Sequence, residues 1–492
     1  MIWRDYHNTT KHTPESLRQS QHTLDWANMP DPFRHYEGVP VLDLPADPAS
    51  PLVPALELLG GIQGSSEASD GAGFLSQLLY YSAAISASKR VAATGHRYAL
   101  RVNPSSGNLH PTEFHCWTRG LRQWPDGLYH YRPSSHMMEQ RALGRCDLPA
   151  GEASPLLFVL TSIVWREAWK YQERAYRYCL HDMGHAWQAL ALAAEAMGCS
   201  ATAIGHFADD SISQICGLPE DEWPMLLVQV SGAPVPTGKP DGHREVWHGG
   251  TPNRLSNEIR TYPELGRMHV ATKQQIGEPG SFGELDRMPG GKGVLVLPSP
   301  AVSTQPFGSV ARSRRSALDF EGGSRTMSLA QLSALLSSAL RPVSADFARR
   351  TVVQLYLYVH RVEDLTSGVY RYWPQENQLE LIKAGDQRVI AAGLSLRQDL
   401  AGNACVAFSL VAGLNQATAA YGTRGYRYAH FEAGAIGQRL YIVAEALGLG
   451  ATGIGAFFDD EVNNYLHLTA LQGQAIYHFA VGYPVPDPRL NA

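Results

Sequence analysis

Two short segments of this 492-residue chain combine residue types that suit the binding of a phosphate or a polar ring. Residues 101–111 read RVNPSSGNLHP, and such a loop offers backbone N–H groups and small hydroxyls to an anionic or ring-shaped ligand. Arg314, Arg315 and Ser316 form the second segment, and a planar guanidinium fork matches phosphate oxygens bidentately. Residue type alone favours another interpretation of the arginines, a solvated basic start to the helix that Ser328 would cap.

Lys170 and Tyr171 are a candidate acid–base pair because they are neighbours in the sequence. An ammonium group close to a phenol favours the tyrosinate, so we expect Lys170 to lower the pKa of Tyr171. A surface lysine beside an interface tyrosine is the alternative interpretation. Both interpretations fit the sequence.

His181 and His185 are four residues apart, a spacing that places both on one face of a helix, where they can hold a metal ion. The segment HDMGH lacks the glutamate of zinc-protease helices, and the helix is otherwise apolar. The six cysteines are scattered without a Cys-x-x-Cys pair. The sequence therefore predicts a packed histidine pair, reduced thiols and no metal site.

The composition is that of a globular protein without a strong charge bias. Hydrophobic residues make up 44% of the chain, charged residues make up 18%, and the formal net charge is −5. This balance does not favour nucleic acid or an anionic membrane as a partner. The start of the chain lacks a signal-peptide profile, and no apolar stretch reaches the length of a membrane span. We expect a cytoplasmic protein.

The elements that must position these residues occur twice. One copy begins at Tyr176 with YRYCLHDMGHAWQALALAAEAMGCSATAIGHFADD, and the other begins 250 residues later, at Tyr426, with YRYAHFEAGAIGQRLYIVAEALGLGATGIGAFFDD. The match runs without a gap and continues past the helical part, so helix composition does not explain it. Two fused copies of one domain, replacing a two-fold dimer, explain it better.

Each copy is predicted to be a mixed α+β unit, in which an apolar helix lies between β-rich segments. We expect a Pro-rich N-terminal arm that packs over the first half, and a long surface connection between the halves. The predicted regions are the arm at 1–64, the first half at 65–236, the connection at 237–304 and the second half at 305–492. The halves would form an intramolecular pseudo-dimer, so the chain is expected to be a monomer or a weak homodimer.

The segments NPSSGNLHPTEF and RRS…F…MSLAQL resemble the two flavin-binding segments of the nitroreductase-like flavoproteins, which bind flavin mononucleotide (FMN). The segment WKYQERAYRYCLHDMGH is similar to the SagB/ThcOx branch of that superfamily, the azoline dehydrogenases of peptide-modifying systems. The resemblance covers roughly 73–236 and 305–488. It implies two fused nitroreductase-like domains, each a mostly antiparallel sheet flanked by helices.

In this superfamily FMN lies in a dimer interface, so the resemblance implies roles for residues of both halves. Arg314 and Arg315 would neutralise the phosphate, Ser316 would donate its hydroxyl, and Arg489 is a further candidate. The residues expected along the ribityl chain and the flavin ring are Pro104, Ser105, Ser106, Gly107 and Asn108 of the first half, and Gly453, Ile454 and Gly455 of the second.

Each half lacks what the other supplies. The first half has the Pro-Ser-Ser loop and Lys170 but no Arg-Arg-Ser start, whereas the second half has a loop shortened to RPVSADFARR and Ala420 in the place of Lys170. We therefore expect one FMN per chain, lying between the halves. The other end of the interface would be filled by side chains, for which the N-terminal arm is a candidate.

The resemblance implies an FMN-dependent oxidoreductase. As in the azoline dehydrogenases, Lys170 and Tyr171 would remove a proton from an azoline ring while hydride passes to FMN, and the product would be the aromatic azole. The substrate would be a modified peptide or a small molecule, with a cyclodehydratase or another biosynthetic protein as a partner. Two alternatives stay open, an NAD(P)H-dependent reductase of nitro or quinone compounds and a non-catalytic flavin-binding subunit of a biosynthetic complex.

Overall fold

The structure is a computed structural model that describes residues 1–91, 95, 97–144, 155–232, 245–273, 294–348 and 350–490. The predicted boundary between residues 236 and 237 lies outside these ranges. None of the helices within them combines the length and the hydropathy that a membrane crossing requires.

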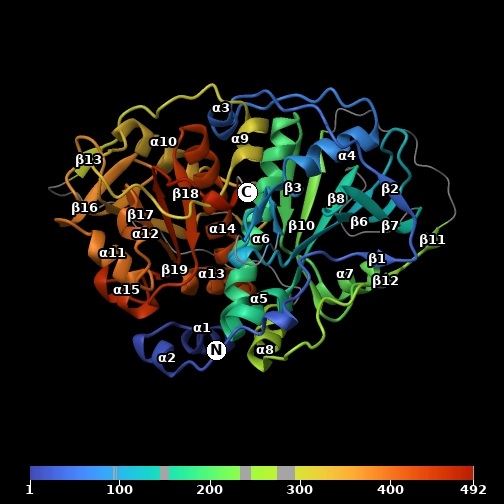
Figure 1. Ribbon diagram of the computed structural model, residues 1–492, viewed down its shortest axis with the longest axis horizontal. Coiled ribbons are helices and arrows are strands. Elements are labelled where there is room, and N and C mark those ends of the chain that lie inside the picture. The colour runs from blue at the N-terminus through green and yellow to red at the C-terminus, as the bar shows by residue number, and fades with distance from the viewer. Residues whose placement is uncertain are drawn as a thin grey trace.

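An antiparallel sheet forms the centre of the first half, at the right of Figure 1. Its strands lie in the order β11–β7–β6–β5–β8–β10–β9, and β2 of the N-terminal arm also pairs with β7. Their bounds are β2 (Val41–Asp43), β5 (Thr112–Thr118), β6 (Gly127–Arg132), β7 (Met137–Leu143), β8 (Leu156–Ile163), β9 (Ser200–Ile204), β10 (Glu222–Ser231) and β11 (Val246–Trp247). The central strands β5 and β8 are buried along their whole length.

The second half repeats this arrangement at the left of Figure 1, in the order β13–β16–β15–β14–β17–β19–β18. Its strands are β13 (Val294–Val296), β14 (Val353–Val359), β15 (Gly368–Trp373), β16 (Gln378–Ala384), β17 (Val406–Ala412), β18 (Gly450–Ile454) and β19 (Gln474–Gly482). Two small sheets pair β1 (Tyr36–Glu37) with β12 (Thr251–Pro252), and β3 (Ile85–Arg90) with β4 (Arg97–Arg101). Two antiparallel sheets flanked by helices confirm the predicted α+β class.

Helices cover both sheets and fill the space between them. In the arm and the first half they are α1 (Ile2–Thr9), α2 (Pro14–Gln19), α3 (Ala55–Leu59), α4 (Gly71–Tyr80), α5 (Val164–Tyr171), α6 (Ala175–Ala196) and α7 (Asp209–Cys216). The later ones are α8 (Pro263–Thr272), α9 (Phe307–Ser313), α10 (Leu329–Ala339), α11 (Arg388–Leu394), α12 (Leu400–Asn403), α13 (Leu414–Tyr421), α14 (Gly425–Ala446) and α15 (Asp459–Tyr465). Ser328 caps α10 in a capping box with Gln331, as the sequence predicts.

The two halves meet along α6 and α14, which pack against each other between the sheets (Figure 1). A Cβ added to Gly184 would lie 2.1 Å from the carbonyl oxygen of Phe431, and one added to Gly434 would lie 2.2 Å from that of His181. The two backbones can approach this closely because neither glycine has a side chain. The helices of the repeated segment therefore form the core of the pseudo-dimer.

Reciprocal ion pairs repeat the two-fold relation across this interface. Arg174 and Arg177 of the first half bind Asp459 of the second half at 2.9 and 2.6 Å. Arg427 of the second half binds Asp209 of the first half at 2.6 Å. All five side chains are buried. Although burial opposes it, the guanidinium groups lower the pKa of Asp209 to about 2, so the carboxylate is charged in the folded protein.

The N-terminal arm contacts both halves, and the segment expected to be a surface connection contains a helix that packs at the interface. Helix α1 packs against α8, and Lys11 binds Asp460 of the second half at 2.7 Å. Lys273, directly after α8, binds Asp210 of the first half. Because Asp210 and Asp460 are equivalent residues of the two copies, α1 and α8 occupy two-fold-related places.

Candidate active site

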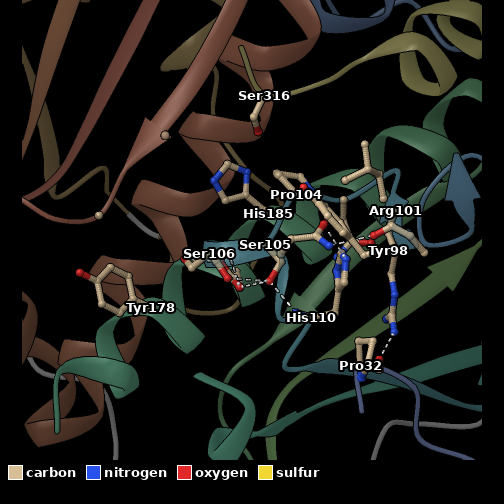
Figure 2. Close-up of a pocket in the computed structure, with 18 of the residues that line it drawn as sticks. Pro32, Tyr98, Arg101, Pro104, Ser105, Ser106, His110, Tyr178, His185 and Ser316 are labelled. Carbon is tan, nitrogen blue, oxygen red and sulfur yellow. Dashed lines mark hydrogen bonds between the residues drawn. The ribbon is translucent and has the colours of Figure 1, made fainter. Parts of the chain in front are cut away.

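A cavity of about 1300 Å³ lies between the halves and is lined by residues of both. Figure 2 shows Ser105 and Ser106 of the first half and Ser316 of the second half around this space. Of the predicted site residues, those lining the cavity are Pro104, Ser105, Ser106, Gly107, Asn108, Tyr171, Arg314, Arg315, Ser316, Gly453, Ile454 and Gly455. The structure thus brings together segments that lie more than two hundred residues apart in the sequence.

A buried carboxylate that the sequence analysis did not identify holds the serine loop in place. Asp182 of α6 accepts hydrogen bonds from Ser105 Oγ at 2.7 Å, from Ser106 Oγ at 2.9 Å and from the Ser106 N–H at 3.0 Å. Burial raises the pKa of Asp182 to about 6, and these hydrogen bonds oppose the rise. The two hydroxyls therefore fix the loop to α6.

Gly107 brings the loop against the candidate acid–base pair. Its φ is +59°, a conformation that favours glycine, and a Cβ there would lie 2.7 Å from the Tyr171 hydroxyl and 3.1 Å from Lys170 Nζ. Lys170 Nζ lies 5.2 Å from the centre of the Tyr171 ring. Both polar groups therefore lie directly beside the loop.

The expectation that Lys170 lowers the pKa of Tyr171 is wrong. Burial raises this pKa well above its usual value, and the neighbouring Glu167, Tyr178 and Asp182 raise it further. A phenol in these surroundings stays protonated at neutral pH. Tyr171 can therefore donate a hydrogen bond or a proton, but it is not suited to act as a base.

Arg314 is a buried cation whose hydrogen bonds cross from the second half to the first. Its Nε donates to the carbonyl oxygen of Val102 and its Nη2 to that of Arg101, both at 3.1 Å. Its Nη1 is buried and has no hydrogen-bond partner among the described residues. Burial lowers the pKa of Arg314. A phosphate oxygen would supply the acceptor that this nitrogen lacks.

The other predicted phosphate ligands, Arg315, Ser316 and Arg489, differ in their contacts. Arg315 donates to backbone carbonyls on both sides of the interface, and burial together with a neighbouring guanidinium lowers its pKa to about 10. Ser316 Oγ lies 2.8 Å from the hydroxyl of Tyr441. Arg489 is absent from the cavity lining, and its guanidinium binds Asp487 at 2.7 Å.

The glycines of the second-half segment make room for two tyrosines that also line the cavity. A Cβ on Gly453 would lie 1.9 Å from the Tyr477 hydroxyl, and one on Gly455 would lie 2.1 Å from the ring of Tyr178. The family resemblance implies that these glycines lie along the ribityl chain and the flavin ring. Packing of the tyrosines requires them as well.

At the other end of the interface, the shortened loop of the second half occupies the equivalent place. The Asp346 carboxylate accepts hydrogen bonds from the N–H groups of Gly205 at 2.7 Å and His206 at 3.0 Å. The Phe347 ring stacks on Tyr428 at 4.2 Å, and the cavity that remains there measures about 10 Å³. Side chains do fill this end, but the expectation that they come from the N-terminal arm is wrong.

The two ends differ in whether two equivalent backbone N–H groups have a hydrogen-bond acceptor. Gly455 and Ala456, the equivalents of Gly205 and His206, line the large cavity. No described residue accepts a hydrogen bond from their N–H groups. One end of the pseudo-dimer is open to a ligand with a flat ring and an acceptor edge, and the other end is closed by an aromatic ring and a carboxylate.

His181 and His185 take part in packing at the interface. His185 lines the cavity, where its Nε2 lies 3.1 Å from the Tyr477 hydroxyl and its Nδ1 lies 3.3 Å from Gln438 Oε1. The His181 ring stacks on Tyr477 at 4.4 Å. Among the described residues, no group of three or more His, Cys, Asp or Glu side chains is placed to hold a metal ion.

The N-terminal arm adds a wall to the cavity that the sequence analysis did not predict. The wall residues are Trp26, Met29, Pro30, Asp31, Pro32 and Phe33. Arg101 donates from Nη2 to the carbonyl oxygen of Pro32 at 2.7 Å (Figure 2). The Pro-rich sequence of the arm predicts packing over the first half but does not show that the arm reaches a cavity.

The sequence matches known proteins over both halves. The profile of the Nitroreductase family matches residues 84–232 and 311–483, which together exceed half of the chain. A curated nitroreductase-like protein of Methanocaldococcus jannaschii is 33% identical over 119 residues, which are 24% of this chain and 59% of that protein. The match thus spans less than two thirds of that relative's length.

Solved structures extend the comparison to the whole fold. A nitroreductase-like protein of Anabaena variabilis superposes with a TM-score of 0.79 at 25% identity, covering 98% of this chain and 99% of that chain. The McbBCD microcin synthetase complex of Escherichia coli, with truncated pro-MccB17 bound, gives a TM-score of 0.31 at 20% identity, covering 48% and 85%. A match at that level bears on neither substrate nor partner.

Proposed function

The chain belongs to the nitroreductase family, and on that basis we propose that it is an FMN-dependent oxidoreductase with one flavin site formed by both halves. The observation that carries the proposal is the asymmetry of the interface. At one end of the interface, the serine loop and the arginine pair line a cavity of about 1300 Å³. At the other end of the interface, Asp346 and Phe347 fill the equivalent space.

The residues that line the open end fit FMN. Arg314 offers a buried nitrogen without an acceptor, and Arg315 adds a second cation for a dianionic phosphate. The N–H groups of Gly455 and Ala456 can donate to the acceptor edge of a flavin ring, as their equivalents donate to Asp346. When bound, FMN supplies two-electron redox chemistry by taking up or releasing a hydride.

We propose further that the reaction is the dehydrogenation of an azoline-type ring in a small molecule or a modified peptide. Two ionisable residues of α5 support this proposal, because they are present at the open end and absent at the closed end. Glu167 and Lys170 correspond to Ala417 and Ala420. Reducing a nitro or quinone group needs no dedicated base, whereas breaking a ring C–H bond requires one.

We propose a different task for each residue of the pair. Tyr171 stays protonated and can hydrogen-bond the ring heteroatom. Lys170 is the residue of the pair that we propose as the acceptor of the proton from the ring carbon. The fixed serine loop, which lies against both groups, would keep the substrate beside them.

The variant Lys170→Ala tests the proposal. With a 2-aryl-thiazoline as substrate and oxygen as acceptor, we expect the flavin-loaded variant to lose about 10²–10⁴-fold in turnover. Its bound-flavin absorbance should match that of the wild type and of the control Lys383→Ala, an exposed lysine outside the cavity.

Two outcomes would overturn the proposal. If the wild type leaves the thiazoline unchanged but reduces menadione with NADH, and Lys170→Ala does so equally well, the protein is a reductase. If flavin-loaded wild type catalyses neither reaction, the non-catalytic subunit becomes the better interpretation.

A further inference from the structure

The arm wall, residues 26–33, lies outside the two segments that match the family profile, yet it forms one side of the cavity. Its sequence, WANMPDPF, places a proline at every second position after Met29. A residue that precedes proline is held in an extended conformation, and Met29 has φ −58° and ψ 125°. Residues Trp26–Asn28 form one turn of 3-10 helix, and from Met29 onward the wall is extended along the cavity.

Buried side chains of the first half hold the arm wall by its backbone. Arg166 Nε donates to the carbonyl oxygen of Asp31 at 2.9 Å, and Arg101 Nη2 donates to that of Pro32 at 2.7 Å. The Asp31 carboxylate accepts from the N–H of Phe33 at 2.8 Å. With these polar groups already paired, the wall is preformed and offers mainly apolar surface to the cavity.

The arm wall also lies beside the helix that carries the candidate acid–base pair. The ring of Trp26 packs edge-on against Trp169, the residue before Lys170, with 5.3 Å between ring centroids. Even so, 68% of the Trp26 surface is exposed. An indole this exposed at the rim of a cavity can bury more area when a flat apolar group stacks on it.

We propose that Trp26 and Met29 form a subsite for an aromatic substituent of the substrate, next to the ring that reacts. The inference rests on the proposed function for the identity of that ring. It follows from the continuity of the arm wall with the cavity that Tyr171 lines, from the exposed indole, and from the thioether of Met29, which packs well against aromatic rings. The subsite predicts a preference for aryl over alkyl substituents.

Binding of product-like azoles tests the subsite without turnover. The dissociation constants of 2-phenylthiazole and 2-methylthiazole would be measured by perturbation of the flavin absorbance in the loaded protein. We expect the wild type to prefer the phenyl compound. Trp26→Ala should reduce this preference about three- to tenfold, which corresponds to the contribution of one aromatic contact to binding. Trp26→Phe should retain most of the preference.

The matched control is Trp247→Ala, which removes another exposed tryptophan that lies outside the cavity lining. Flavin content should be equal in all these variants. If the ratio of the dissociation constants of the phenyl and methyl compounds is unchanged in Trp26→Ala, the proposed subsite is wrong even if thiazolines are oxidised. A reduced ratio in a protein that oxidises no thiazoline would support the subsite and reject only the proposed reaction.

Discussion

Replacing Arg314 by alanine should weaken FMN binding, because this residue of the second half supplies a buried donor to a cavity shared with the first half. Its Nε and Nη2 are already used by backbone carbonyls, so Nη1 is the nitrogen left for a ligand. A hydrogen bond between charged groups is worth about 1.5–3 kcal/mol. The dissociation constant of FMN should therefore rise about tenfold to 150-fold.

The assay is a titration of apoprotein with FMN, followed by quenching of the flavin fluorescence. Arg489→Ala is the matched control, because Arg489 binds Asp487 and lies outside the cavity lining, so its loss should leave the affinity unchanged. Thermal unfolding of each apoprotein would separate weaker binding from a loss of fold. Equal FMN affinities in wild type and in folded Arg314→Ala would refute this assignment of the phosphate site.

Two further predictions concern the closed end and the ion pairs. Phe347→Ala should lower the free energy of unfolding by about 3–5 kcal/mol, measured with denaturant, and leave FMN affinity unchanged, because the buried ring packs at the end without ligand. A loss of bound flavin would contradict this. The folded pKa of Asp209 is lowered from 3.8 to about 2, so its ion pairs stabilise the protein above pH 3.8 and this stability is lost as the pH falls toward 2. Measured with urea, the free energy of unfolding should fall by about 2 kcal/mol between these pH values, and Asp209→Asn should abolish this fall. An unchanged pH dependence of the free energy of unfolding in Asp209→Asn would argue against the pairing.

The features that follow from the repeat could be predicted from the sequence. An uninterrupted match at a constant offset implies the same fold twice, and the structure has two antiparallel sheets with α6 and α14 between them. The complementary losses in the two copies also indicated which segments share a cavity. The N-cap of α10 could also be predicted from the sequence, since Ser328 does cap this helix.

The features that depend on packing between distant segments could not be predicted. Lys170 is next to Tyr171 in the sequence, but burial sets the direction of the Tyr171 pKa shift, and Glu167 and Asp182 add to it. The shortened loop showed that a ligand site was lost, but not that Asp346 would take over its hydrogen bonds. The segments of α1 and α8 share only a His-x-x-Thr-Lys pattern, at 7–11 and 269–273, which is too short to show their equivalence without the structure.

The direct test of the central claim is the number of flavins per chain in the purified, FMN-saturated protein. Flavin released by denaturation would be measured by its absorbance and compared with the protein concentration from amino-acid analysis. A ratio near one that is unchanged in Phe347→Ala, and that falls in Arg314→Ala once free FMN is removed, is the result expected for one composite site with a closed twin. A ratio near two would contradict it.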